Sequence, residues 1–318
     1  MKFGKKTMTV SIAVSLALFL GACGNETETA TEEVKEETTQ TASQEKPEAQ
    51  TEEKTETTET VAIPGLIAGT PMKDGTYTLT EKEYKNGYKV NFEIKVKDGK
   101  IIESNYDNVN EEGKSKMEDD EYQKNMSEKT GTGPKEFIPA FNEQLLEKQN
   151  AGDLEVVTGA THSFDSFMNY TQQLIQAAQK GDTTPIEIDS QAPLNDGEYS
   201  LTEKNEKNGY KVSFTMTVKD GKITESNYDN INEAGKSKVE DEEYQKNMSD
   251  KTGTGPKEFI PALNANFVKA QSAGDVEVVT GATHSWHTFK IYAGQLINAA
   301  QKGDTTPIEV DNFIFEKK

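Results

Sequence analysis

The residues best suited to chemistry gather in one short segment that the chain contains twice. The sequence Thr-Gly-Ala-Thr-His-Ser spans residues 158–163 and returns unchanged at 280–285. All three histidines, His162, His284 and His287, and the single tryptophan lie in or next to these two copies. Each copy therefore offers hydroxyl groups, an imidazole and two small residues that let a bulky group approach the backbone.

Each hexapeptide precedes an apolar pattern of helical period, so we expect it to form the turn that leads into a helix, with Ser163 and Ser285 as N-caps. The free amides and the dipole of a helix N-terminus favour an anion, above all a phosphate, and a threonine hydroxyl offers a covalent attachment point. The alternative is a purely structural turn, since a duplication copies turns and sites alike. The candidate binding residues are Thr158, Gly159, Ala160, Thr161, His162 and Ser163 in the first copy and Thr280, Gly281, Ala282, Thr283, His284 and Ser285 in the second.

Composition excludes several other kinds of site. With Cys23 as its only cysteine, the chain cannot form an intrachain disulfide, a CxxC pair or a thiolate metal cage. His287 aligns with Asp165, so the two copies do not share a histidine pair, and we predict no metal site. A net charge of −20 and the lack of any arginine argue against a nucleic-acid partner. No triad or carboxylate pair for hydrolysis is evident, so no catalytic residues are predicted.

The two hexapeptides belong to a duplicated domain, because Thr161 and Thr283 are 122 positions apart and the same offset relates the sequences around them without gaps. The first half of each repeat alternates apolar and polar residues, and Asn-Gly and Asp-Gly pairs mark two-residue turns, which predicts an antiparallel meander. We expect its strands in the first repeat at Thr76–Thr80, Tyr88–Val96 and Lys100–Tyr106.

The second half of each repeat has helical patterns, which gives an α+β fold in two tandem copies. One helix is expected from Pro134, or only from Pro139 if that proline interrupts it. The next should run from Ser163 to Gly181, and a polar helix is expected over 118–127. The predicted buried residues are Phe137, Ile138, Phe141, Leu145 and Leu146 on the first helix, and Phe164, Phe167, Thr171, Leu174, Ile175 and Ala178 on the second.

The N-terminus predicts export and lipid anchoring. Three lysines precede an apolar stretch too short to span a membrane, which then closes with Leu20-Gly21-Ala22-Cys23. This ending resembles the bacterial lipobox, in which the cysteine is diacylated and becomes the mature N-terminus. The acidic, threonine-rich sequence that follows has too few apolar residues to fold and is predicted to be a disordered tether. The predicted parts are therefore a signal peptide (1–22), a lipidated cysteine with its tether (23–68) and two domains (69–188 and 189–318).

The repeated hexapeptide resembles the flavinylation sequence of FMN-binding domains, in which an acidic residue and two spacers precede Ser/Thr-Gly-Ala-Thr and a further serine. In that family a Mg²⁺-dependent flavin transferase takes FMN from FAD and links its phosphate to the last threonine. The resemblance implies two covalent FMN groups, on Thr161 and Thr283. The sequence departs from the family where an aspartate is usual, so the carboxylate that the transferase recognises is left open among Asp153, Glu155, Asp275 and Glu277.

Lipobox, tether and duplication together resemble the doubly flavinylated FMN-binding-domain lipoproteins of Gram-positive extracellular electron transfer, the peptide-pheromone-encoding type. This resemblance implies a redox carrier, rather than an enzyme with a substrate pocket, that is lipid-anchored on the extracellular face of the cell membrane. Its electrons would come from a quinone-linked membrane donor and pass to ferric iron or free flavin shuttles. The alternative function is a lipid-tethered binding or adhesion module without a cofactor. Only the resemblance suggests that a signal-peptide fragment within Ser11–Ala22 is additionally a pheromone.

Overall fold

The computed structural model describes residues 63–316, which fall within one compact unit spanning Thr57–Lys318. The predicted signal peptide, its pheromone fragment, Cys23 and most of the predicted tether therefore lie outside the described residues. The end of the predicted tether is wrong in one respect, because Leu66–Ala68 form strand β1. This apolar segment pairs antiparallel with β10 (Ile314–Phe315), near the other end of the described chain.

The first repeat begins with the predicted meander. Strands β2 (Gly75–Glu81), β3 (Lys89–Lys97) and β4 (Lys100–Val109) pair antiparallel in sequence order. Along β3 the apolar side chains are buried and the polar ones between them are exposed or half-buried, as the period of two predicts. The sequence did not predict β5 (Ile186–Ile188), which follows the last helix and pairs parallel with β2. The order of strands in the sheet is β4-β3-β2-β5.

Two tight turns fix the register of the meander. Asn86 and Gly87 have φ angles of 53° and 81°, and Asp98 and Gly99 have 51° and 70°. Two successive residues with positive φ match the twist of a hairpin, which is why Asn-Gly and Asp-Gly pairs are favoured there. The predicted hairpin turns are confirmed.

Three α-helices follow in the first repeat. A short 3₁₀ turn, η1 (Lys116–Glu118), leads into the polar helix α1 (Asp120–Thr130). Helix α2 (Pro134–Lys148) begins at Pro134 and continues through Pro139, which is exposed and costs the helix one backbone hydrogen bond. The predicted buried face of α2 is confirmed except at Leu146, which is 40% exposed.

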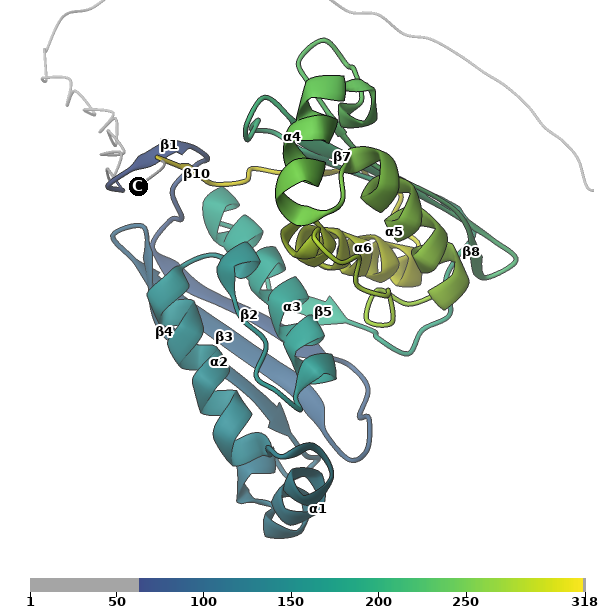
Figure 1. Ribbon diagram of the computed structural model, residues 1–318. Helices are drawn as coiled ribbons and strands as arrows, with labels where there is room; N and C mark the ends of the chain where they lie inside the picture. The colour runs from purple at the N-terminus through teal and green to yellow at the C-terminus, as the bar shows by residue number, and fades with distance from the viewer. Residues whose placement is uncertain (1–62, 317–318) are drawn as a thin grey trace, which may run out of the picture. The chain divides into compact units, whose positions relative to one another are not determined.

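The last helix of the first repeat, α3 (Thr161–Lys180), comes after a second 3₁₀ turn, η2 (Ala151–Asp153). It ends at Gly181 in the left-handed conformation, and its predicted inward residues are buried. Its predicted N-cap is wrong, because the helix begins two residues before Ser163 and its N-cap is Ala160. Helices α2 and α3 lie on one face of the sheet (Figure 1). The predicted α+β fold is confirmed.

The second repeat has the same strands and α-helices, but no 3₁₀ turn equivalent to η2 among its described residues. Its sheet contains β6 (Gly197–Glu203), β7 (Lys211–Lys219), β8 (Lys222–Ile231) and β9 (Ile308–Val310), in the order β8-β7-β6-β9. Its helices are η3 (Lys238–Glu240), α4 (Glu242–Thr252), α5 (Pro256–Ala270) and α6 (Thr283–Lys302).

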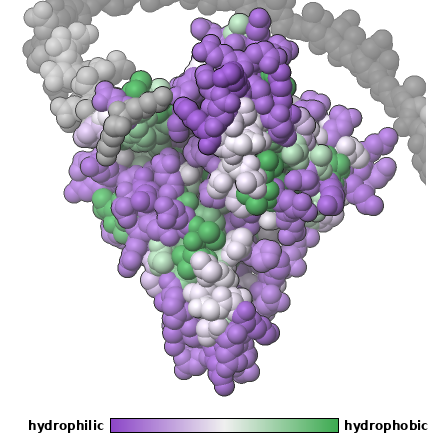
Figure 2. All heavy atoms as spheres, in the orientation of Figure 1, coloured by the Kyte–Doolittle hydropathy of each residue, from purple (hydrophilic) through white to green (hydrophobic). Residues whose placement is uncertain are grey.

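An aromatic cluster forms the centre of the first core. Phe92 on β3, Tyr106 on β4, Phe141 on α2 and Phe167 on α3 have ring centres 4.9–6.0 Å apart. These fully buried rings join the sheet to both helices. The face of the molecule seen in Figure 2 is largely hydrophilic, with small apolar patches, as expected from the composition.

Candidate functional site

The hexapeptide forms a tight turn that enters α3. Gly159 has a φ of +85°, the Ala160 amide donates to the Val157 carbonyl at 2.9 Å, and the Phe164 amide closes the first helical turn on the Ala160 carbonyl at 2.9 Å. Thr161 is therefore the first helical residue, and its side chain is exposed. Ala160 cannot cap the helix through its side chain, so the first amides of α3 are available to an anion.

The position of this turn depends on a close contact with the end of α1. A Cβ atom on Gly159 would lie 2.5 Å from the Thr130 carbonyl oxygen and 3.0 Å from its Cβ. The end of α1 therefore packs directly against the hexapeptide. In the second repeat Gly281 has the same close contact with the Thr252 carbonyl.

We expect Gly159→Ala to destabilise the protein more than Gly131→Ala. Both glycines have a φ near +84°, but nothing lies within 4 Å of a Cβ on Gly131. The Gly131→Ala control should therefore lose only about 1–2 kcal/mol of stability, because alanine is strained in a left-handed backbone conformation. At Gly159 overpacking adds a further loss of about 1–3 kcal/mol. Urea unfolding of the two variants measures the difference. Equal losses would mean that the turn moves away from Thr130 without cost.

A cleft of about 530 Å³ opens beside the turn of the first repeat. It extends from the start of α3 to the β2–β3 hairpin and to α1. Its lining residues are Glu81, Lys85, Asn86, Tyr88, Val90, Tyr106, Asn108, Lys116, Tyr122, Met126, Thr130, Phe137, Gly159, Ala160, Thr161, His162, Ser163 and Ser166. Five of the six predicted binding residues line it, and Thr158 lies in the adjoining turn.

A buried lysine lies in this cleft. Lys116 is 8% exposed, and its Nζ lies 4.8 Å and 4.3 Å from the ring centres of Tyr88 and Tyr122. Burial lowers the pKa of Lys116 to about 8, although nearby carboxylates, Glu81 foremost, act in the opposite direction. Lys238 repeats the arrangement, with its Nζ 4.7 Å from each of two rings and its pKa lowered to about 8 by burial. Each repeat therefore contains a buried lysine that is still mostly charged at neutral pH.

A buried asparagine amide at the same place in each repeat lacks a hydrogen-bond partner among the described residues. The side-chain Nδ2 of Asn108 is buried and has no hydrogen-bond partner among the described residues, and the same holds for Nδ2 of Asn230. A buried donor without a partner is costly and is unusual in a folded protein. Its occurrence at the same place in both repeats fits a ligand with a hydrogen-bond acceptor, such as a ring carbonyl.

The carboxylate in the cleft has a structural role. Glu81 Oε1 accepts a hydrogen bond from the Tyr170 hydroxyl at 2.6 Å, and Oε2 accepts one from the Val90 amide at 2.9 Å. Glu203 accepts the equivalent pair from Tyr292 and Val212 at 2.6 and 2.8 Å. These bonds tie α3 and α6 to the strands of their own sheets.

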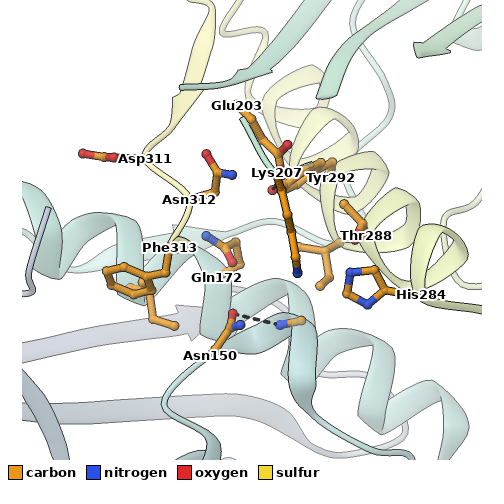
Figure 3. Close-up of a pocket in the computed structure, with 13 residues that line it drawn as sticks. Asn150, Gln172, Glu203, Lys207, His284, Thr288, Tyr292, Asp311, Asn312 and Phe313 are labelled. Carbon is orange, nitrogen blue, oxygen red and sulfur yellow. Dashed lines mark hydrogen bonds between the residues drawn. The ribbon is translucent and has the colours of Figure 1, made fainter. Parts of the chain in front are cut away.

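The second repeat has the same groups around Thr283. Of the residues that line the first cleft, all but one have an identical counterpart 122 positions later, the exception being Ser166, which becomes Thr288. His284, Lys207 and Thr288 line a cavity of about 80 Å³ together with Asn150, which belongs to the first repeat (Figure 3). Partial burial and the charge of Lys207 lower the pKa of His284, while Asp153 raises it.

The predicted recognition carboxylates are all exposed. Asp153 accepts a hydrogen bond from Asn150 Nδ2 at 2.9 Å, and the backbone of Glu155 is held by Gln144. Asp275 is the counterpart of Asp153, and Glu277 lies 3.5 Å from Lys269. Their role in recognition stays a prediction.

The sequence reasoning missed Asn108 and Lys116. They reach the cleft from β4 and η1, far from the hexapeptide in sequence. Both residues are unchanged in the two repeats, which was the available signal, but charged residues such as Lys116 are usually exposed.

Each region that matches a known protein is about as long as one repeat. No family model matches the chain. Over 123 residues, which are 38% of this chain and 87% of the other protein, it is 33% identical to the 15 kDa lipoprotein of Treponema pallidum (strain Nichols). The chain belongs to the family of this lipoprotein.

Two solved structures also resemble part of this chain. The crystal structure of the CPE2226 protein from Clostridium perfringens has 37% identity and a TM-score of 0.36, and covers 37% of this chain and 98% of that one. A solution NMR structure from Clostridium thermocellum has 24% identity and a TM-score of 0.23, and covers 34% of this chain and 92% of that one.

Membership of a lipoprotein family agrees with the lipobox at Cys23, and this protein is a membrane-associated, lipid-anchored module. Within residues 63–316, no helix has both the length and the apolar character that a membrane-spanning helix needs.

Proposed function

We propose that this lipoprotein is an electron carrier with two FMN groups, each joined through its phosphate to Thr161 or Thr283. The observation that carries the proposal is an uncapped helix N-terminus with an exposed threonine as its first residue, beside a cleft of about 530 Å³. The equivalent helix in the second repeat begins in the same way. A phosphate ester at this threonine lies next to the free amides of the first helical turn, where an anion is stabilised.

Four features of the chain would hold the phosphate and the planar ring of an FMN group. The start of α3 binds the phosphate, and Gly159 and Ala160 leave room for it. Asn108 offers its unpartnered amide to a ring carbonyl, and Lys116 supplies positive charge in a partly buried place. The flavin ring supplies the redox chemistry, while the protein sets its position and electrostatics. A covalent ester also fits a chain without arginine, because it does not need a guanidinium to retain the phosphate.

The proposed electron donor is a quinone-linked component of the membrane, and the proposed acceptors are ferric iron or free flavins. The lipid on Cys23 would keep the two domains on the extracellular face of the membrane, at the end of the acidic tether. A flavin transferase that uses FAD and Mg²⁺ would make the esters.

The test is the intact mass of the denatured protein after purification from its native membrane. Two added FMN groups support the proposal. Without any added flavin, in a host shown to have an active flavin transferase, the redox function would be wrong. A lipid-tethered binding module would then remain.

Replacing Lys116 by methionine is expected to lower the redox potential of the flavin on Thr161 by tens of millivolts. A buried positive charge favours the reduced ring, which carries more negative charge, and a charge roughly 10 Å away contributes about 1–2 kcal/mol at an effective dielectric constant near 20. The effect should fade above pH 8, because the pKa of Lys116 is about 8 and the wild-type side chain then loses its charge. Potentiometric titration of a Thr283→Ala background, which isolates this flavin, measures it.

The matched control is Lys129→Met, which removes an exposed lysine from the end of α1. It should leave the potential nearly unchanged because solvent screens the charge. Equal shifts for both variants would show that Lys116 acts only through the net charge of the domain.

A further inference from the structure

We propose that each repeat supplies one wall of the other repeat's attachment site. The loop at residues 150–153 would border the site of Thr283, and the loop at 272–275 would border the site of Thr161. This inference rests on the proposed function for its flavin readout, but the placement of the loops does not. It makes the tandem arrangement itself a part of each site.

The cavity beside the second attachment site shows the arrangement directly. Asn150 and Gly152, which follow α2 of the first repeat, line the same cavity as His284 and Thr288 on the first turns of α6 (Figure 3). The loop is held in shape by its own hydrogen bonds, with the Gly152 amide donating to Asn150 Oδ1 at 3.2 Å. The charge of Asp153 also acts on the His284 ring, the neighbour of Thr283.

The first attachment site has the reciprocal arrangement. Ser272 and Gly274, which follow α5 of the second repeat, line a cavity of about 230 Å³ with His162 and Asp165 on the first turns of α3. A Cβ atom on Gly274 would lie 3.4 Å from Asp165 Oδ2, which is ordinary van der Waals contact. Residues 150 and 272 are equivalent positions, so each loop makes the same approach to the opposite repeat.

Buried polar contacts between α3 and α6 hold the two repeats in this arrangement. Lys290 and Asp165 form an ion pair of 2.6 Å, with the lysine side chain only 2% exposed. The Asn169 amide donates to Asn298 Oδ1 at 2.9 Å, and Gln173 donates to the same oxygen at 3.0 Å. Each of these buried polar groups needs its partner from the other repeat. The contacts therefore favour one arrangement of α3 and α6, and with it one position of each loop beside the opposite site.

A bulky residue in either loop tests the proposal. Neither Gly152 nor Gly274 has a positive φ, and a Cβ fits at both, so Gly152→Tyr and Gly274→Tyr should fold. Mass spectrometry of proteolytic peptides gives the flavinylated fraction at each threonine separately. We expect Gly152→Tyr to lower the fraction at Thr283 at least severalfold and to leave that at Thr161 near wild type, and Gly274→Tyr to do the reverse. The alanine variants of both glycines are the size controls.

A second readout uses the unloaded protein, made in a host without a flavin transferase. The chain has three histidines, so their ring NMR signals are few enough to follow individually. Gly152→Tyr should shift the signals of His284 and spare those of His162, with the opposite result for Gly274→Tyr. If each variant instead affects only the site or the histidine of its own repeat, or neither, the proposal is overturned. If the wild-type protein carries no flavin in a competent host, the proposed function fails while the NMR result still decides the placement of the loops.

Discussion

Replacing Thr161 by alanine is expected to remove one of two flavins and leave the other in place. Thr161 is the first residue of α3, where its hydroxyl adjoins both the free amides and the cleft. Its side chain is exposed, so its loss should change the free energy of unfolding by no more than about 0.5 kcal/mol. Thr283→Ala should remove the other flavin, and the double variant should carry none. The intact masses of the denatured variants give the number of attached flavins.

Two other hydroxyls in the same turn provide the controls. Thr158 and Ser163 lie within three residues of Thr161, so Thr158→Ala and Ser163→Ala test whether any nearby hydroxyl serves as the acceptor. In both variants the flavin that the first repeat carries should still be joined to Thr161. A Thr161→Ala protein that still carries two would place the attachment elsewhere and remove the main support for the assignment of the site.

Replacing Lys290 by methionine is expected to destabilise the protein by about 3 kcal/mol or more, because breaking one partner of a buried ion pair typically costs about 3–5 kcal/mol. Lys290 lies 2.6 Å from Asp165, and the two side chains are 2% and 15% exposed. Methionine occupies the equivalent position 168 in the first repeat, so its shape suits the helix. The main effect is the loss of the charge partner. Urea unfolding at neutral pH measures the loss, and the Asp165→Asn/Lys290→Met double variant should recover most of it.

The loss should shrink as the pH falls. Burial raises the pKa of Asp165 above its ordinary value of 3.8, and Lys290 opposes this shift. Without the lysine the carboxyl pKa rises further, so the folded state holds its proton more tightly than the unfolded chain. Stability of Lys290→Met is then retained at low pH and lost as the pH rises through the folded pKa of Asp165. The double variant lacks this carboxyl and should not show the effect. A Lys290→Met protein as stable as wild type at pH 7 would mean that the pair does not hold the repeats together.

Local patterns were enough to predict the elements that frame the site. The alternation along β3 and the Asn-Gly and Asp-Gly pairs predicted the meander, because strand period and positive-φ turns depend on residues close in sequence. The short strand β5 was missed, since three residues contain no measurable period. The predicted N-cap at Ser163 was wrong because the close contact of Gly159 with Thr130 places the turn, and this contact joins residues far apart in the chain.

The sequence alone determined that this protein is a duplicated α+β domain with a repeated hydroxyl-bearing turn before a helix, and it predicted the lipid anchor at Cys23. Only the tertiary structure brought Asn108 and Lys116 to that turn, and it alone decided that the loop carrying Asp153 approaches the other repeat. It also decided that Lys290 is buried, although its position on α6 alone suggests an ordinary surface lysine. The physical reason is that burial and charge pairing depend on which faces of the two repeats pack together. A periodic pattern predicts that a helix or strand has an apolar face, but not what packs against that face.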